Sequence, residues 1–292
     1  QSRNFPRMHP LTLIMVLALL DNQLLTVLTS ISYPISNGVQ PIHLSSHASA
    51  SPAAINNITC LNPNGQVHEK TLQSEIYQAP VKFSVYLPPC YDENSTILYP
   101  VIYLLHGQTY NNEQWIRLGV AEEADTLINK KQISPFIIIM PNDPDWRQPG
   151  DSPFGRMLVE ELIPHVDDTY PTRAVRQYRA IGGLSRGASW ALHLGLTEWK
   201  LFSRIGTHSL PVFVSDNNDI PRWLNAIPSQ SIPQIYVDTG NQDPELNIAR
   251  SFENLLSTRY IPHDWHMFTG SHEEEYWARH IENYLLWYAC EW

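Results

Sequence analysis

The sequence predicts one α/β domain over residues 60–292, with a mostly parallel central sheet of about eight strands and helices on both faces. Short apolar runs alternate with longer amphipathic segments, a pattern typical of a parallel sheet covered by helices. Most of these runs are apolar on both faces, as expected for strands inside such a sheet. The chain has 292 residues and a hydrophobic content of 43%, which is enough to bury a substantial core.

The strands fall into two groups. Residues 66–77 and 81–89 show period-two alternation and predict an antiparallel hairpin at the sheet edge, with its turn near Gln78 and Ala79. The other strands are short runs rich in Ile, Val, Tyr and Phe, at 99–107, 135–141, 178–185, 201–209, 234–240 and 264–270. Amphipathic segments between and after them predict helices at 121–131, 155–170, 188–199, 245–260 and 274–292.

The N-terminal segment differs from the rest of the chain. Within residues 1–30, basic residues precede the apolar run 11–20, which is the order found in a signal peptide. A second apolar stretch follows Asp21, so a membrane anchor is another interpretation and an apolar helix packed on the domain is a third. Residues 31–59 are rich in Ser, Pro, Asn and His and predict a disordered linker. We expect a secreted or cell-envelope protein, which contacts membrane only if the first segment is kept.

The cysteines and the net charge indicate which bonds and partners the protein can have. We predict a Cys60–Cys90 disulfide, because the hairpin brings the flanks of its two strands together, and a free Cys290. No C-x₂-C or C-x₂-H spacing is present, so we expect no metal site. The net charge is −10 and the chain has no dense Lys/Arg block, which makes nucleic acid an unsuitable partner.

The stretch Gly183-Leu184-Ser185-Arg186-Gly187 has the form G-x-S-x-G and joins an apolar strand to a helical pattern. This context is the one a nucleophile elbow needs, in which a strained turn exposes the serine at the end of the strand. The glycines avoid clashes where the backbones come close. The helix that starts at Arg186 points its N–H groups toward an oxyanion. Ser185 is therefore the predicted nucleophile.

A serine needs a base and an orienting acid, and loops after later strands offer both. Asp243 follows the strand at 234–240, and His272 follows the strand at 264–270. The order Ser185, Asp243, His272 is the order of α/β-hydrolases.

Other acids and histidines are expected to have structural roles. Asp238 lies within its strand, facing a neighbouring layer, and Glu245 falls on a helix. His263 and His266 belong to the strand before the loop, and His280 is expected to be solvated in mid-helix.

The predicted oxyanion hole consists of two backbone N–H groups, from Arg186 and from Gln108 in the loop after the third strand. His106-Gly107 precedes this position, and the glycine lets the chain turn close to the reacting carbonyl.

At this point the sequence resembles the esterase family that includes feruloyl esterases, enterochelin esterases, S-formylglutathione hydrolases and mycolyltransferases. The matching pieces cover roughly residues 66–288 and are "YLPPCYDE", "YPVIYLLHG", "VEELIPHVDDTYPT", "RAIGGLSRGASWAL", "TGNQDP" and "FTGSHEEEYW". The resemblance implies an α/β-hydrolase fold, a serine acyl-enzyme mechanism and no cofactor. By position it implies Ser185 as nucleophile, Asp243 as acid and His272 as base. The sequence departs from the family at one point. Many members have another glycine soon after the HG, whereas here "QTYNNEQW" follows, so the acyl pocket is expected to differ in shape from theirs.

Candidate substrate contacts are mostly aromatic residues on loops at the same edge of the sheet: His106, Tyr110, Trp115, Trp146, Arg147, His208 and Trp277. An aromatic wall suits aryl or sugar esters, although the same side chains are also suited to packing the loops. We expect an exported serine carboxylic-ester hydrolase acting on aryl (feruloyl-type) or acetyl esters of carbohydrates. An acyltransferase on the same scaffold and a non-catalytic binding module remain alternatives.

Overall fold

The computed structural model describes residues 60, 62–94 and 96–292, which form one eight-stranded sheet in the order β1-β2-β4-β3-β5-β6-β7-β8. The hairpin β1–β2 is antiparallel and β2 pairs antiparallel with β4, whereas all later neighbours are parallel. The strands are β1 (Gln66–Ser74), β2 (Ala79–Leu87), β3 (Val101–Leu105), β4 (Ile137–Pro141), β5 (Arg179–Leu184), β6 (Arg204–His208), β7 (Gln234–Gly240) and β8 (Asp264–Phe268).

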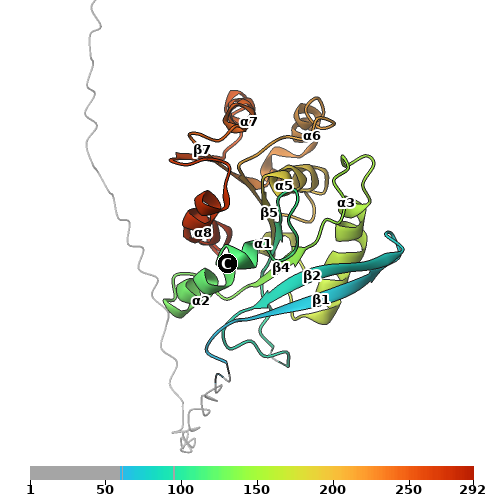
Figure 1. Ribbon diagram of the computed structural model, residues 1–292, viewed down its shortest axis with the longest axis vertical. Helices are drawn as coiled ribbons and strands as arrows, with labels where there is room; N and C mark the ends of the chain where they lie inside the picture. Colours follow the sequence, from blue (N-terminus) through green and yellow to red (C-terminus); the bar gives the residue numbers. More distant parts are fainter. Residues whose placement is uncertain (1–59, 61, 95) are drawn as a thin grey trace, which may run out of the picture. The chain divides into compact units, whose positions relative to one another are not determined.

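Helices cover both faces of this sheet (Figure 1). They are α1 (Gln114–Arg117), α2 (Val120–Asn129), α3 (Phe154–Met157), the π-helical turn η1 (Leu158–Leu162), α4 (Ile163–Thr169), the 3₁₀ turn η2 (Arg176–Tyr178), α5 (Arg186–Thr197), α6 (Ile220–Ala226), the 3₁₀ turn η3 (Ser229–Ser231), α7 (Leu246–Thr258) and α8 (Glu274–Tyr288).

Two buried clusters fill the space between the sheet and its helices. Because side chains alternate along a strand, Ile102 and Leu104 of β3 pack with α1, α2 and α8. Tyr103 and Leu105 of the same strand pack with α3 to α7 on the other face. The strands β3 to β6 are buried along their whole length, as expected for inner strands of a sheet covered by helices on both faces.

The sequence predicted most of these elements. The eight expected strands and the five longer helical segments are confirmed, as are the hairpin turn before Ala79 and the mostly parallel sheet with helices on both faces. The short helices α1 and α6 were missed, since one or two helical turns carry little periodic signal.

The helix α8 lies close to the middle of the sheet because two strand residues there have no side chain. A Cβ added to Gly182 of β5 would lie 1.6 Å from the Tyr288 hydroxyl, and one added to Gly206 of β6 would lie 1.8 Å from it. Both glycines therefore admit the Tyr288 side chain of α8. This fixes the helix that begins two residues after His272.

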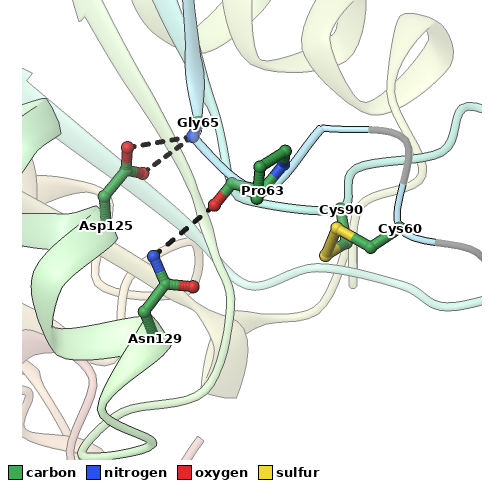
Figure 2. Close-up of a disulfide and its surroundings, with 6 residues drawn as sticks. All are labelled: Cys60, Pro63, Gly65, Cys90, Asp125 and Asn129. Carbon is green, nitrogen blue, oxygen red and sulfur yellow. Dashed lines mark hydrogen bonds between the residues drawn. A yellow bond between two sulfur atoms is a disulfide. The ribbon is translucent and has the colours of Figure 1, made fainter.

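A disulfide and hydrogen bonds hold the first described residues against the rest of the fold (Figure 2). The predicted disulfide between Cys60 and Cys90 is present, and Cys290 is free and exposed. Asp125 of α2 accepts the Gly65 N–H with both carboxylate oxygens at 2.9 Å. The expected signal peptide or anchor at 1–30 and the linker at 31–59 lie outside the described residues. Within the described part of the chain, no helix is long and apolar enough to cross a membrane.

Removing the disulfide is expected to lower stability. The disulfide closes a loop between two cysteines 30 residues apart, and this loop restricts the unfolded chain. The variant Cys60→Ser/Cys90→Ser removes the restriction, so the free energy of unfolding is expected to fall by about 3 kcal/mol. Urea unfolding measures this loss. The exposed, free Cys290 provides the matched control, and Cys290→Ser is expected to leave the midpoint unchanged. Equal midpoints for the two variants would contradict the stabilising role.

Candidate active site

The turn between β5 and α5 has the geometry of a nucleophile elbow. Ser185 lies there with φ 53° and ψ −125°, a strained conformation for a residue with a side chain. A Cβ on Gly183 would lie 2.3 Å from the Gly187 carbonyl carbon, and a Cβ on Gly187 would lie 2.2 Å from the Leu105 carbonyl oxygen. The Ser185 N–H donates to the His208 carbonyl at 2.9 Å. The glycines at both positions are thus required by backbone contact.

Three side chains from different loops meet at this turn. His272 Nε2 lies 2.8 Å from Ser185 Oγ, and His272 Nδ1 lies 3.0 and 3.1 Å from the two carboxylate oxygens of Asp243. An ionised carboxylate only accepts hydrogen bonds, so Nδ1 carries the proton and Nε2 accepts from the serine hydroxyl. The Asp243 side chain is fully buried, whereas that of His272 is 24% exposed. The imidazole is therefore held by the buried Asp243 at Nδ1 and is partly exposed to solvent.

Asp243 remains a carboxylate in spite of its burial. Burial alone would raise its pKa, but hydrogen bonds from His272, Ser209 and the Glu245 N–H hold that pKa below its usual value. The Glu245 N–H donates to Asp243 Oδ1 at 2.8 Å. The loop after β7 thus presents a charged acceptor to the imidazole.

Asp238, the alternative acid, has other partners. It is fully buried and accepts hydrogen bonds from Tyr276 Oη at 2.6 Å and Tyr284 Oη at 3.0 Å. Its second oxygen lies 2.6 Å from His208 Nδ1. The structural role expected for Asp238 matches this cluster under α8.

His208 is fully buried, with Nε2 3.1 Å from the Tyr288 hydroxyl and its ring stacked on Tyr284. The expectation that His208 contacts substrate near the mouth of the site is corrected, because its ring nitrogens are used in the core. His280 is also corrected: it is only 9% exposed and stacks on Phe268 rather than lying in solvent. The burial of His208 and His280 could not be predicted from the spacing of residues along the strand or the helix.

The loop after β3, here called the oxyanion loop, carries Gln108, whose N–H is the second expected oxyanion donor. The Gly107 N–H donates to Gln114 Oε1 at 2.8 Å, which leaves the Gln108 N–H as that loop's candidate. Gln114 is fully buried and its Nε2 donates to Glu274 Oε1 at 3.2 Å. Glu274 in turn forms an ion pair with Arg117 at 2.5 Å. This bridge joins the oxyanion loop to the start of α8, next to His272.

Arg186 follows the serine and contributes more than its backbone. Its guanidinium donates to Asp143 Oδ2 at 3.1 Å and to the carbonyls of Asp145 and Arg147 at 3.3 and 2.7 Å. Trp190 Nε1 donates to the same Asp143 oxygen at 3.0 Å. Burial raises the pKa of Asp143 to about 6, against the opposing effect of Arg186. The side chain of Arg186 therefore fixes the loop after β4 beside the elbow.

His106 also belongs to this scaffold and is corrected as a substrate contact. It is 5% exposed, Nδ1 lies 2.7 Å from the Gly107 carbonyl, and Nε2 accepts the Asp143 N–H at 2.8 Å. Both ring nitrogens are therefore used. Burial lowers the pKa of His106 to about 4, so the ring is neutral at pH 7.

The remaining expected contacts separate by exposure. Trp146 is 58% and Tyr110 is 41% exposed, and Arg147 extends into solvent beside Asp145, with which it pairs at 3.0 Å. Trp277 is 3% and Trp115 is 1% exposed, so these two are corrected to packing residues. Trp146, Arg147 and Tyr110 stay available to a substrate.

Gln114, Asp143, Ser209 and Glu274 were not among the residues singled out from the sequence. Asp143 comes two residues after β4 and Ser209 comes directly after β6. Because functional residues of such sheets lie on the loops after strand ends, the sequence carries a signal for both. Gln114 and Glu274 lie on helices with no local signal. Among the described residues, no group of three or more His, Cys, Asp or Glu side chains could hold a metal ion.

A family model described as "Putative esterase" matches residues 74–288. The chain belongs to this esterase family. It is 27% identical over 230 residues to an endo-1,4-beta-xylanase/feruloyl esterase of Xylanibacter ruminicola, and 24% identical over 223 residues to an acetyl esterase of Caldicellulosiruptor saccharolyticus. The first match covers 75% of this chain but only 31% of that protein, and the second covers 64% and 82%.

Solved structures show the same fold. A ferulic acid esterase superposes with a TM-score of 0.70 at 24% identity, covering 77% of this chain and 98% of that one. A ferulic acid esterase of Anaeromyces mucronatus in complex with ferulic acid gives a TM-score of 0.61 at 20% identity, covering 76% and 90%. The chain therefore has the α/β-hydrolase fold.

The neutral state of His106 predicts a pH dependence of stability. Its pKa is about 4 when folded and 6.5 in the reference state, so its contribution is complete above pH 6.5 and is lost as the pH falls through 4. The variant His106→Gln does not titrate at this position. The gap in unfolding free energy between the unmodified protein and this variant is expected to shrink as the pH falls from 7 to 4. Urea unfolding at several pH values measures the gap, and a constant gap would refute the buried neutral ring.

Proposed function

We propose that this esterase is an exported serine carboxylic-ester hydrolase that works through an acyl-enzyme. The observation that carries the proposal is the continuous hydrogen-bonded series from Ser185 Oγ through His272 to Asp243. In this arrangement a base lies within hydrogen-bond reach of the hydroxyl, and an acid orients the base. Membership of the esterase family supports the same reaction class.

In the proposed reaction, Ser185 Oγ attacks the ester carbonyl carbon while its proton passes to His272 Nε2. Asp243 holds the Nδ1 proton and stabilises the imidazolium that forms. The N–H groups of Gln108 and Arg186 donate to the tetrahedral oxyanion, and each such donor is worth about 3 kcal/mol of barrier. His272 then protonates the leaving alcohol, and the acyl group remains on Ser185. Water deprotonated by His272 releases the acid and restores the serine.

We further propose ester-linked carbohydrates as the substrate class, with aryl (feruloyl-type) or acetyl groups on the acyl side. The relatives named as feruloyl and acetyl esterases support this class. Exposed Trp146 and Tyr110, on the loops after β4 and β3, offer apolar faces to an aromatic ring or a sugar. Export is supported by the Cys60–Cys90 disulfide, since disulfides persist in oxidising compartments.

Two alternatives differ in what they predict. An acyltransferase on this scaffold would pass the acyl group to an alcohol acceptor instead of water. A non-catalytic binding module would not need the Ser185–His272–Asp243 contacts, so their presence favours an enzyme.

The variant Ser185→Ala is expected to abolish p-nitrophenyl acetate turnover and labelling by a fluorophosphonate probe, because the attacking hydroxyl is gone. The thermal midpoint is expected to stay nearly unchanged, since one hydroxyl at the surface of the site is lost. Gel fluorescence after labelling and a thermal melt measure both effects. Ser215, an exposed serine, provides the control Ser215→Ala with labelling retained. Turnover by a folded Ser185→Ala variant would remove Ser185 as nucleophile.

A substrate panel tests the acyl preference. Feruloyl-arabinoxylan, acetyl-xylan and short p-nitrophenyl esters are compared by kcat/KM, with a glycosyl alcohol added to detect transfer. Because Trp146 is proposed to stack on the substrate, Trp146→Ala is expected to raise KM about 10-fold for the carbohydrate ester and to leave KM for p-nitrophenyl acetate unaffected. Equal changes on both substrates would argue against a contact with the carbohydrate or aryl group.

A further inference from the structure

We infer that Gln114, oriented by Glu274, is a positioning residue that fixes the turn from which the Gln108 N–H donates to the oxyanion. This inference rests on the proposed function, in which that N–H stabilises the tetrahedral intermediate. Gln114 is fully buried, and its side-chain amide joins the oxyanion loop to Glu274, the first residue of α8. One amide therefore links the loop that carries an oxyanion donor to the helix that follows the proposed base His272.

The orientation of the Gln114 amide is determined by its two partners. The Gly107 N–H can only donate, and it lies 2.8 Å from Gln114 Oε1, so the amide oxygen faces the turn. The amide nitrogen then faces Glu274, whose carboxylate accepts from Nε2 at 3.2 Å. Arg117, on the same short helix α1, donates to the same Glu274 oxygen at 2.5 Å. A flipped amide would lose both hydrogen bonds, so only one orientation satisfies the side chain.

The hydrogen bonds around Gly107 determine where the Gln108 N–H points. The Gly107 carbonyl and the Gln108 N–H belong to one trans peptide group, in which they point in opposite directions. The Tyr110 N–H donates to this carbonyl at 3.3 Å. His106 Nε2 accepts the Asp143 N–H, so Nδ1 carries the ring proton and donates to the same carbonyl at 2.7 Å. Both backbone polar groups of Gly107 are thus hydrogen-bonded, and the Gln108 N–H is directed away from its carbonyl.

The turn lies against the proposed nucleophile and its backbone is strained. A Cβ placed on Gly107 would lie 3.5 Å from Ser185 Cβ and 3.5 Å from Gln114 Oε1. Thr109, which follows Gln108, has φ 69°, an unusual value for a β-branched residue. Strain of this kind persists only where surrounding contacts hold it. Because Thr109 is exposed, we attribute this restraint to the buried hydrogen bond between Gly107 and Gln114.

Both ends of the bridge are anchored in the core. Trp115 follows Gln114, is 1% exposed, and donates from Nε1 to the Leu105 carbonyl at the end of β3 at 3.0 Å. At the other end, Tyr288 holds α8 against the middle of the sheet. The bridge therefore connects two rigid supports, and through them it relates the oxyanion donor to the position of His272.

The variant Gln114→Met keeps the length of the side chain but removes its oxygen and nitrogen. The Gly107 N–H then loses its acceptor, and the strained turn is expected to relax. We expect kcat on p-nitrophenyl acetate to fall about 10- to 100-fold, because a small misplacement of a catalytic group costs up to about 100-fold. KM is expected to stay within about threefold, because the buried Gln114 side chain is not open to substrate. Steady-state kinetics measures both quantities.

Asn112→Leu is the matched control for the loss of a buried amide. Asn112 lies two residues before Gln114 and is also buried, but its Nδ2 donates to Ser84 Oγ on β2 at 2.8 Å. Both variants are expected to lower the urea midpoint, since each loses a buried hydrogen bond. Only Gln114→Met is expected to lower kcat. Equal losses of kcat in the two variants would indicate a general structural effect and overturn the inference.

The Glu274 end of the bridge gives a second test, which decides the matter if Gln114→Met does not fold. Glu274→Gln keeps an oxygen acceptor for the Gln114 amide, and its kcat is expected to stay within about twofold. Glu274→Met removes the acceptor, and a loss of about 3- to 10-fold is expected. Glu275→Met is the control, because it removes the same charge from the same turn of α8, but Glu275 pairs with Arg279 at 2.6 Å. Its kcat is expected to be unchanged.

A trifluoromethyl ketone separates positioning from partial unfolding. Ser185 Oγ adds to its carbonyl carbon while the proton passes to His272, and the resulting oxyanion occupies the same place as that of the tetrahedral intermediate. The Ki of this analogue is expected to rise by the factor by which kcat/KM falls in Gln114→Met and Glu274→Met, because both quantities depend on the same donors. Partial unfolding lowers the amount of active enzyme but leaves Ki unchanged.

Three results would each contradict a positioning role for Gln114. They are an unaltered kcat in folded Gln114→Met, an unchanged Ki in a variant with reduced kcat, and equal kcat values for Glu274→Gln and Glu274→Met. Failure of the proposed function itself looks different, because then Ser185→Ala keeps the turnover and labelling of the unmodified protein.

Discussion

The site depends on the direct contact of three backbones at the ends of β3 and β5. Gly187 of α5 lies against the carbonyls of Leu105 and His106, and Gly183 lies against the backbone of Gly187. Because no side chain separates these segments, the turn between them is tight enough to hold Ser185 at a positive φ. The same closeness places the first N–H groups of α5 beside the loop that carries Gln108. A single steric constraint thus sets the position of the hydroxyl and of both expected oxyanion donors.

The other half of the site is positioned by the core under α8. Tyr276, Tyr284 and Tyr288 of this helix converge on the buried Asp238 and His208. Their hydroxyl groups satisfy polar groups that would otherwise be costly to bury. Since α8 begins two residues after His272, this polar core also limits the movement of the imidazole. The same contacts therefore stabilise the fold and hold the proposed base in place.

Features that depend on neighbouring residues in the sequence could be predicted. The strands follow from apolar runs, and the association of Ser185, Asp243 and His272 follows from the meeting of parallel strand ends at one sheet edge. Exposure could not be predicted for His106 and His208, because partners from distant segments bury them: the Asp143 N–H in one case and Asp238 in the other. Gln114 was missed for the same reason, since its partner Glu274 is 160 residues away.

The two outer strands of the sheet differ in how they meet other molecules. β1 carries His68, Glu69 and Lys70, and Glu69 pairs with Lys82 across the hairpin at 2.9 Å. Charges of this kind discourage a second chain from adding to an open edge. β8, at the opposite end, has Met267 46% exposed and only Asp264 as a charged residue. In concentrated or partly unfolded samples, intermolecular strand pairing is therefore favoured at β8 over β1, and a lysine introduced on β8 is expected to reduce it.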